Sequence, residues 1–190
     1  TNFSNLDSTS DTKNYTGTWK WTNNQLDFNN KNTRVAFNNS KHKRTYIKDS
    51  LLEGEYNSTV NTLYGSHLIK FDNVDFLVGT ESEQVDANFL TNITGLYPYT
   101  SNVDKTRDTY GVFVKTNVIA EPFVISSGIR HDFISGFGEK TTGRFGLSKD
   151  GIRTSVSLGY RVPTLYEMYG KDNYGFTGNP NLKEEDTVSY

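Results

Sequence analysis

Apolar and polar residues alternate with a period of two along much of this chain. The clearest case is the segment 152–161. Its even-numbered positions are largely apolar, and its odd-numbered positions form the other face: Arg153, Ser155, Ser157, Gly159 and Arg161. Alternation of this kind predicts a β-strand whose two faces meet different surroundings. The chain is therefore predicted to be all-β, and Pro163 is predicted to end this strand because proline removes a ladder donor.

The same alternation predicts the other strands. They are expected over 34–38 and 44–48, or as one long strand across a polar patch at 39–43, and over 53–64, 68–72, 74–86, 106–117, 123–133 and 142–147. Residues 1–32 show only a short strand pair. Residues 87–105 are predicted to form a long connection.

The predicted connections differ in length at the two ends of the strands. Short turns are expected near Gly65, near Glu121 and at Asp150-Gly151, where Asp-Gly accepts positive φ. Longer segments, 87–105, 135–140 and 162–182, are expected at the other end. This asymmetry is typical of outer-membrane barrels, with short periplasmic turns and long extracellular loops. A β-sandwich also alternates, with its apolar side on a packed core, so the pattern by itself leaves both architectures open.

Composition excludes several classes of function. A net charge of -2 gives no basic face for nucleic acid. No apolar run approaches the roughly 18 residues that a membrane helix needs, whereas barrel strands need none because half their residues face a polar lumen. Cysteine is absent, which excludes a disulfide framework. The histidines lack partners at ligand spacing, so no metal site is predicted.

No catalytic residue is predicted. His131 and Asp132 are adjacent, but neighbours in a strand point to opposite faces. Residues 136–142 are only superficially like a phosphate loop, since Lys140 follows Glu139 rather than glycine and a strand follows. They are predicted to form a hairpin loop.

Two segments resemble a known family. Residues 159–170 are Gly-Tyr-Arg-Val-Pro-Thr-Leu-Tyr-Glu-Met-Tyr-Gly, and residues 178–185 are Gly-Asn-Pro-Asn-Leu-Lys-Glu-Glu. In order and spacing they closely resemble paired segments in the barrel of TonB-dependent outer-membrane receptors. Glu184 stands where the family commonly has proline, so a less rigid entry into the next strand is expected.

The resemblance implies an antiparallel transmembrane β-barrel of about 22 strands, plugged by an N-terminal domain. Residues 1–190 would be a partial barrel domain of about eight to ten of those strands, with the plug and both chain ends missing. The polar segment 1–10, which has no signal-peptide pattern, and the strand pattern still rising at Tyr190 suggest an internal piece of a longer protein.

The resemblance also implies a function. It places the protein in the outer membrane of a Gram-negative bacterium, as a receptor for energy-coupled uptake of an iron-siderophore complex, haem or cobalamin. Its expected partners are outer-membrane lipid, the nutrient, and the inner-membrane TonB complex, reached through the missing N-terminal part; no cofactor is expected. The alternatives are a secreted β-sandwich adhesin or carbohydrate-binding module, and an outer-membrane enzyme, which would need His with Ser or Asp on one face.

Aromatic residues deep in the long connections are the candidate ligand contacts: Tyr97, Tyr99, Tyr174 and Phe176. Their rings could receive a large ligand, with glycines 170, 175 and 178 letting the loop close over it. The alternative is an aromatic girdle at the membrane interface or loop packing. On the strands, the predicted lipid-facing set is Phe123, Ile125, Ile129, Phe133, Val156, Leu158 and Tyr160, and the arginines on the opposite face are Arg130, Arg144, Arg153 and Arg161.

Overall fold

A single antiparallel sheet of ten strands makes up the described part of the chain. The computed structural model describes residues 6–12, 15–48, 50–93, 98–172 and 175–190. Each strand pairs with its neighbours in sequence. The strands are β1 (Leu6–Thr12), β2 (Tyr15–Asn29), β3 (Thr33–Lys48), β4 (Leu51–Lys70), β5 (Val74–Ile93), β6 (Tyr99–Ala120), β7 (Phe123–Ile134), β8 (Gly138–Lys149), β9 (Ile152–Arg161) and β10 (Glu185–Ser189), with helix α1 (Leu165–Tyr169) between the last two.

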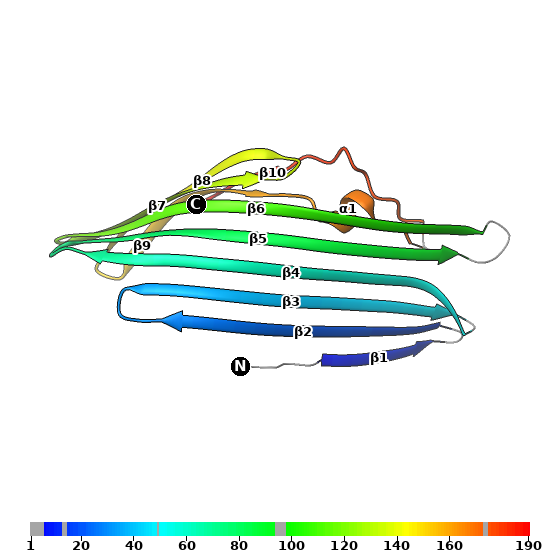
Figure 1. Cartoon of the computed structure of the whole chain (residues 1–190). Coiled ribbons are helices and arrows are strands. Elements are labelled where there is room, and N and C mark those ends of the chain that lie inside the picture. The colour runs from blue at the N-terminus through cyan, green and yellow to red at the C-terminus, as the bar shows by residue number, and fades with distance from the viewer. Residues whose placement is uncertain (1–5, 13–14, 49, 94–97, 173–174) are drawn as a thin grey trace.

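The sheet is one layer with two distinct faces (Figure 1). Helix α1 packs on one face, against β5 and β6, and we call this the inner face. No second sheet packs on the ten strands among the described residues. A β-sandwich needs two facing sheets, so the sandwich alternative is wrong for this chain. The same residues include no helix that is long and apolar enough to cross a membrane.

The outer face carries exposed apolar side chains in the half of the sheet nearest the short turns. Register places them side by side: Leu26 is opposite Phe37, Phe37 opposite Leu63, and Phe145 opposite Val156. A contiguous apolar surface of this kind marks a contact with lipid or protein. We call it the apolar band: Leu26, Phe37, Leu63, Val78, Val112, Ile129, Phe145 and Val156, each exposed by 38% or more.

The central strands are much longer than the apolar band. Strands β4, β5 and β6 have 20, 20 and 22 residues, whereas about 9–11 residues cross a bilayer. Beyond the apolar band their outer face is polar, as at Asn57, Asp86 and Asp104. Half of each strand therefore projects past the band, at the end away from the short turns.

The predicted long connection 87–105 is wrong, because most of it is strand. Ala87 to Ile93 belongs to β5 and Tyr99 to Lys105 belongs to β6. In this half the apolar side chains switch to the inner face: Ala87 and Phe89 are buried there under α1. Apolar and polar residues still alternate in this half, but the apolar side chains lie on the inner face and the polar ones on the outer face.

Two further predicted connections also differ. The turn expected near Gly65 lies inside β4, and the chain reverses at residues 71–73 instead, where the Phe71 amide donates to the Val74 carbonyl. The loop expected at 135–140 has only three residues between β7 and β8, because Gly136 and Gly138 adopt positive φ. The Asp150-Gly151 turn is confirmed, with φ of 48° and 84°.

Candidate functional site

The longest connection between described strands joins β9 to β10, and its residues 162–172 fold back along the inner face. We call the described residues of the segment 162–182 the strap. It opens with a capping box. The Glu167 amide donates to Thr164 Oγ1 over 3.1 Å, and the Thr164 amide donates to Glu167 Oε2 over 2.7 Å. These two bonds satisfy amides that a helix start leaves unpaired. One helical turn therefore forms inside the predicted connection, and it ends at Gly170.

The second half of the strap packs on the first. The Gly178 amide donates to the Gly170 carbonyl over 2.7 Å, and the Asn179 amide donates to the Glu167 carbonyl over 3.0 Å. A Cβ on Gly178 would lie 2.6 Å from the backbone of Met168. This glycine is thus required for close approach of two backbones, and the expectation that it lets the loop close over a ligand stays a prediction.

Hydrogen bonds fix the strap to the inner wall. The hydroxyls of Tyr56 and Thr91 both donate to the Lys171 carbonyl, over 2.9 and 2.7 Å. Arg107 Nη1 donates to the Pro163 carbonyl over 2.6 Å. Leu165 is buried against the wall. Residues 163–171 of the strap are therefore part of the inner wall.

Tyr166 lies at the centre of this packing. Its ring stacks on Phe176, with centroids 5.0 Å apart and planes 7° apart, and meets Tyr56 and Phe89 edge-on, each at 5.5 Å. Burial, with the nearby Tyr56 and Asp172, raises the pKa of the Tyr166 hydroxyl. The hydroxyl therefore stays protonated and donates to Asp172 Oδ2 over 3.3 Å.

The two described ligand-contact candidates both lie at the strap. Tyr99 begins β6, and the Lys171 ammonium sits 3.7 Å from its ring centroid. Phe176 keeps 37% of its surface exposed although Tyr166 covers one side of its ring. Tyr97 and Tyr174 lie outside the described residues. The structure thus brings Tyr99 and Phe176 to one structural unit, and their role as ligand contacts stays a prediction.

Beside the strap is a groove of about 460 Å³ that the sequence did not predict. The Arg44 guanidinium lies over the rings of Tyr46 and Tyr56, at 4.8 and 5.6 Å from their centroids. Period-two spacing of these residues is visible in the sequence, but only the register of four strands brings them together. We call it the aromatic groove, lined by Trp21, His42, Arg44, Tyr56, Phe89 and Tyr166.

A charged network lines the inner face further toward the short turns. Arg130 pairs with Glu81 at 2.9 Å and with Asp132 at 2.8 Å, and the Tyr160 hydroxyl donates to Asp132 over 3.0 Å. Asp132 is only 2% exposed. His131, by contrast, contacts Thr141 on the outer face, so the predicted separation of His131 from Asp132 is confirmed.

The prediction that Tyr160 faces lipid is wrong. The ladder between β8 and β9 ends at Gly143 and Leu158, and beyond it Tyr160 turns its hydroxyl to the buried Asp132. Tyr160 remains paired with Asp186 of β10 but has no partner in β8, so on that side no ladder fixes the direction of its side chain.

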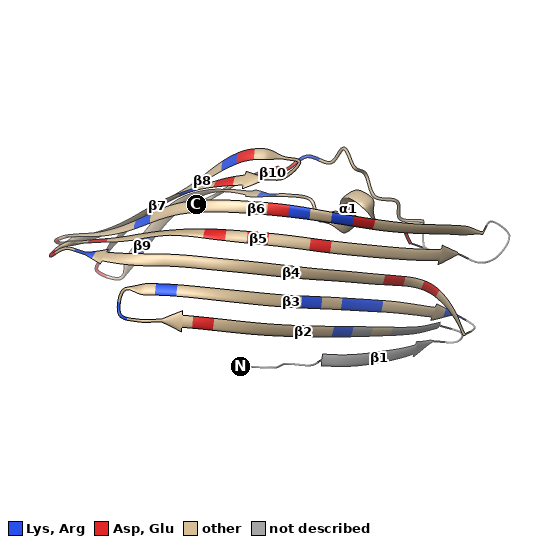
Figure 2. Cartoon of the chain, viewed as in Figure 1, with Lys and Arg blue, Asp and Glu red and all other residues tan. Residues whose placement is uncertain are grey.

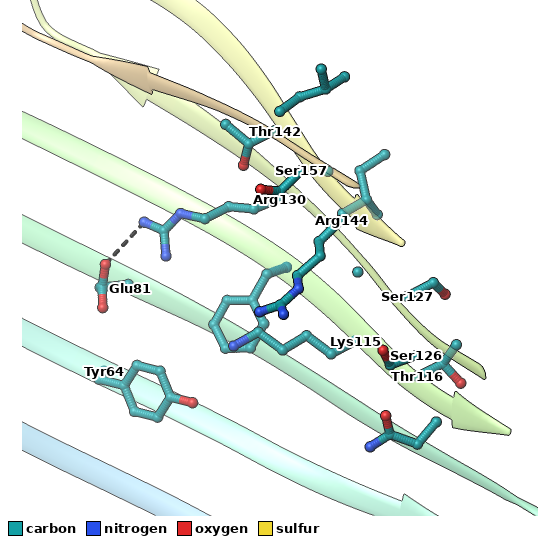
Figure 3. Close-up of a pocket in the computed structure, with 16 residues that line it drawn as sticks. Tyr64, Glu81, Lys115, Thr116, Ser126, Ser127, Arg130, Thr142, Arg144 and Ser157 are labelled. Atoms are coloured by element: carbon teal, nitrogen blue, oxygen red, sulfur yellow. Dashed lines mark hydrogen bonds and ion pairs between the residues drawn. The ribbon is translucent and has the colours of Figure 1, made fainter. Parts of the chain in front are cut away.

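A second cavity, of about 620 Å³, lies over β6, β7 and β8 on the inner face. Figure 3 shows Lys115 and Arg144 extending into it, while Arg130 is directed toward Glu81. Arg130 and Arg144 share this face by register, as predicted. Within the described ranges, no group of three or more His, Asp or Glu side chains is placed to hold a metal ion.

A one-layer antiparallel sheet with an apolar outer band and a charged inner wall is part of a transmembrane β-barrel. A family model described as "TonB dependent receptor-like, beta-barrel" matches residues 1–190, and the chain belongs to this family. Proteins of this family lie in the outer membrane of Gram-negative bacteria, which gives the location of this one.

A solved structure supports the fold. The chain is similar to the copper transporter OprC, with a TM-score of 0.64, 10% identity and coverage of 93% of this chain and 36% of that one. It also matches two Pseudomonas aeruginosa proteins. The first is a mutant of the ferric enterobactin receptor PfeA, with a TM-score of 0.45, 11% identity and coverage of 92% of this chain and 39% of that one. The second is the siderophore receptor PirA, with a TM-score of 0.41, 12% identity and coverage of 90% of this chain and 48% of that one. The chain thus spans less than half the length of each structure. No curated relative matches the chain.

Proposed function

We propose that the protein containing this chain captures a large, scarce nutrient at the cell surface and admits it through the outer membrane. Entry would draw on the inner-membrane TonB complex, acting on parts of the receptor outside residues 1–190. The substrate would be an iron-siderophore complex, haem or cobalamin. The copper, ferric enterobactin and siderophore named for the similar structures belong to proteins of 10–12% identity, and they do not choose among these classes.

The observation that carries this proposal is the docked strap. It gathers aromatic rings on the inner face, at the end of the strands that projects past the apolar band. A ligand arriving from outside would meet this surface before the charged network deeper in the wall. The proposed contacts remain Tyr97, Tyr99, Tyr174 and Phe176, of which Phe176 offers a partly exposed ring.

Uptake by living cells tests the proposal. The full-length receptor would be expressed in cells that lack their own receptors, and uptake of iron-siderophore complexes, haem and cobalamin would be measured with and without the TonB protein. We expect uptake of a nutrient from one class, abolished when TonB is absent. TonB-independent entry, or no uptake of any class at verified surface abundance, would contradict the proposal.

A further inference from the structure

We infer that the aromatic groove is a subsite for a flat, negatively charged aromatic group of the ligand, such as a catecholate or an aromatic carboxylate. The subsite belongs to the proposed uptake function and narrows its substrate to anionic chelates that present aryl groups. Shape, charge and rigidity of the groove each favour this occupant.

The shape suits an aromatic ring. The groove is formed by β2 to β5 on one side and by the strap on the other, so that rings face it from several directions. Tyr56 and Phe89 approach each other at 6.0 Å, and Trp21 and His42 at 6.1 Å. Its volume of about 460 Å³ falls in the range of small-molecule sites, which combine apolar walls with a few polar groups.

The charge suits an anion. Arg44 lies opposite Tyr56 on the inner face and borders the groove, whereas register places Lys20 and Lys43 on the outer face with Asn57. No acidic residue lies among the groove's described lining. Figure 2 shows most basic residues of β2 and β3 toward the end of these strands away from their connecting turn, with one more on β3 beside that turn. Lys43 is paired with Glu55 at 2.9 Å on that outer face, so Arg44 is the cationic side chain that faces the groove.

Arg44 is held in position by ring contacts, and its donors form no hydrogen bond to the part of the chain that the structure describes. Its guanidinium contacts Tyr46 and Tyr56 through their ring faces, and no carboxylate pairs with it among the residues that the structure describes. Cation-π contact fixes a guanidinium, and its planar donors remain suited to two adjacent oxygens of a ligand. A neighbouring pair of oxygen atoms is what catecholates and carboxylates provide.

The rings are fixed before any ligand arrives. The Tyr56 hydroxyl is bonded to the Lys171 carbonyl, Trp21 Nε1 donates to Ser40 Oγ over 2.9 Å, and Tyr166 is stacked on Phe176. Little side-chain entropy is therefore lost when a ring enters the groove, and preorganisation of this kind raises affinity.

Binding to the purified full-length receptor tests the subsite. The probes are a ferric tricatecholate complex, which is anionic and aromatic, a ferric trihydroxamate complex, which is neither, and cyanocobalamin. Isothermal titration should show the tricatecholate as the preferred ligand. Arg44→Gln should weaken its binding by about ten- to a hundredfold, as expected when a charged hydrogen-bonding partner is lost. Arg44→Lys should restore only part of it, because the planar fork is missing.

The control is Arg144→Gln, on the same inner face but outside the groove, which should leave the affinity unchanged. Tyr166→Leu provides a second variant and should weaken tricatecholate binding also. If the receptor prefers trihydroxamate or cobalamin and is indifferent to Arg44→Gln, the subsite is wrong while the uptake function stands. If none of the probes binds and no nutrient is imported, both are wrong.

Discussion

The hydroxyl of Thr91 donates a hydrogen bond of 2.7 Å to the backbone carbonyl of Lys171, joining β5 to the strap. Thr91 is 1% exposed, so the bond lies in a dry environment. The same carbonyl also accepts from Tyr56. A long connection is thus held on the inner wall by two hydroxyls that converge on one oxygen.

Removing both hydroxyls should loosen the strap. Thr91→Val alone should cost about 0.5–1.5 kcal/mol, and together with Tyr56→Phe about 1–3 kcal/mol, because the Lys171 carbonyl is then left unsatisfied. Hydrogen exchange of strap amides in the refolded full-length receptor measures this. Thr106→Val, which removes a bond to Asp86 on the outer face, is the control. Equal exchange in the double variant and the control would show that these bonds do not hold the strap.

Gly111→Ala should disrupt the charged network. A Cβ at this position would overlap Asp132 and the Arg130 guanidinium, whereas a Cβ on Gly65 meets only a methyl group at 4.0 Å. Overpacking of this kind costs about 1–3 kcal/mol, so Gly111→Ala should lower stability in urea unfolding from lipid vesicles while Gly65→Ala should not. Similar losses of stability for the two variants would mean that Arg130 and Asp132 can move to make room for the added methyl group at little cost.

The two faces of β9 should tolerate charge very differently. Val156 belongs to the apolar band, and Ser157 lies on the inner face opposite Arg144. Near the bilayer midplane, Val156→Arg should cost about 2–4 kcal/mol, because an uncompensated charge then lies in hydrocarbon. Ser157→Arg should be far milder. The free energy of folding into lipid vesicles measures both, and equal costs would place the strand one residue out of register.

The polar outer half of β6 should be accessible from outside the cell. The chain contains no cysteine, so single cysteines can be placed without background from residues 1–190. In intact cells, a membrane-impermeant maleimide should label Asp104→Cys, on the projecting half, and spare Lys149→Cys, beside the short Asp150-Gly151 turn. The opposite labelling pattern would mean that the short turns face the cell exterior and the projecting half faces the periplasm.

The start of the strap should weaken in acid. Hydrogen bonds from the Thr164 backbone and from Arg161 lower the pKa of the Glu167 carboxyl below its usual 4.5. Because the pKa of Glu167 is lower in the folded protein than in the unfolded chain, its ionised carboxylate stabilises the folded strap at pH values above the usual pKa. This stabilisation is lost as the pH falls through the lowered pKa. Exchange protection of the strap should therefore decline below about pH 4.5. Glu167→Gln, which keeps the acceptor but cannot titrate, should flatten this decline; an unchanged profile would assign it to other groups.

Much of the architecture is present in the sequence. Alternation predicts the strands wherever one face meets lipid, as at Val156, because burial in hydrocarbon demands apolar residues at every second position. The Asp150-Gly151 turn is predicted from its need for positive φ, and the segments 159–170 and 178–185 indicate the family. These features depend on local sequence alone.

Tertiary structure decided the rest. Residues 87–105 are predicted to be a connection, but they are mostly strand. Their apolar side chains, such as Phe89, face inward to the strap, and the local sequence does not indicate that the strap packs there. The inward turn of Tyr160 occurs where β9 has parted from β8 and meets the buried Asp132 of β7, and the aromatic groove joins Trp21 to Tyr166 across four strands and the strap. Strand register and the packing of the strap determine which residues far apart in sequence become neighbours in space. The interaction energies of these neighbouring residues depend on burial, which exists only once the strands and the strap have assembled.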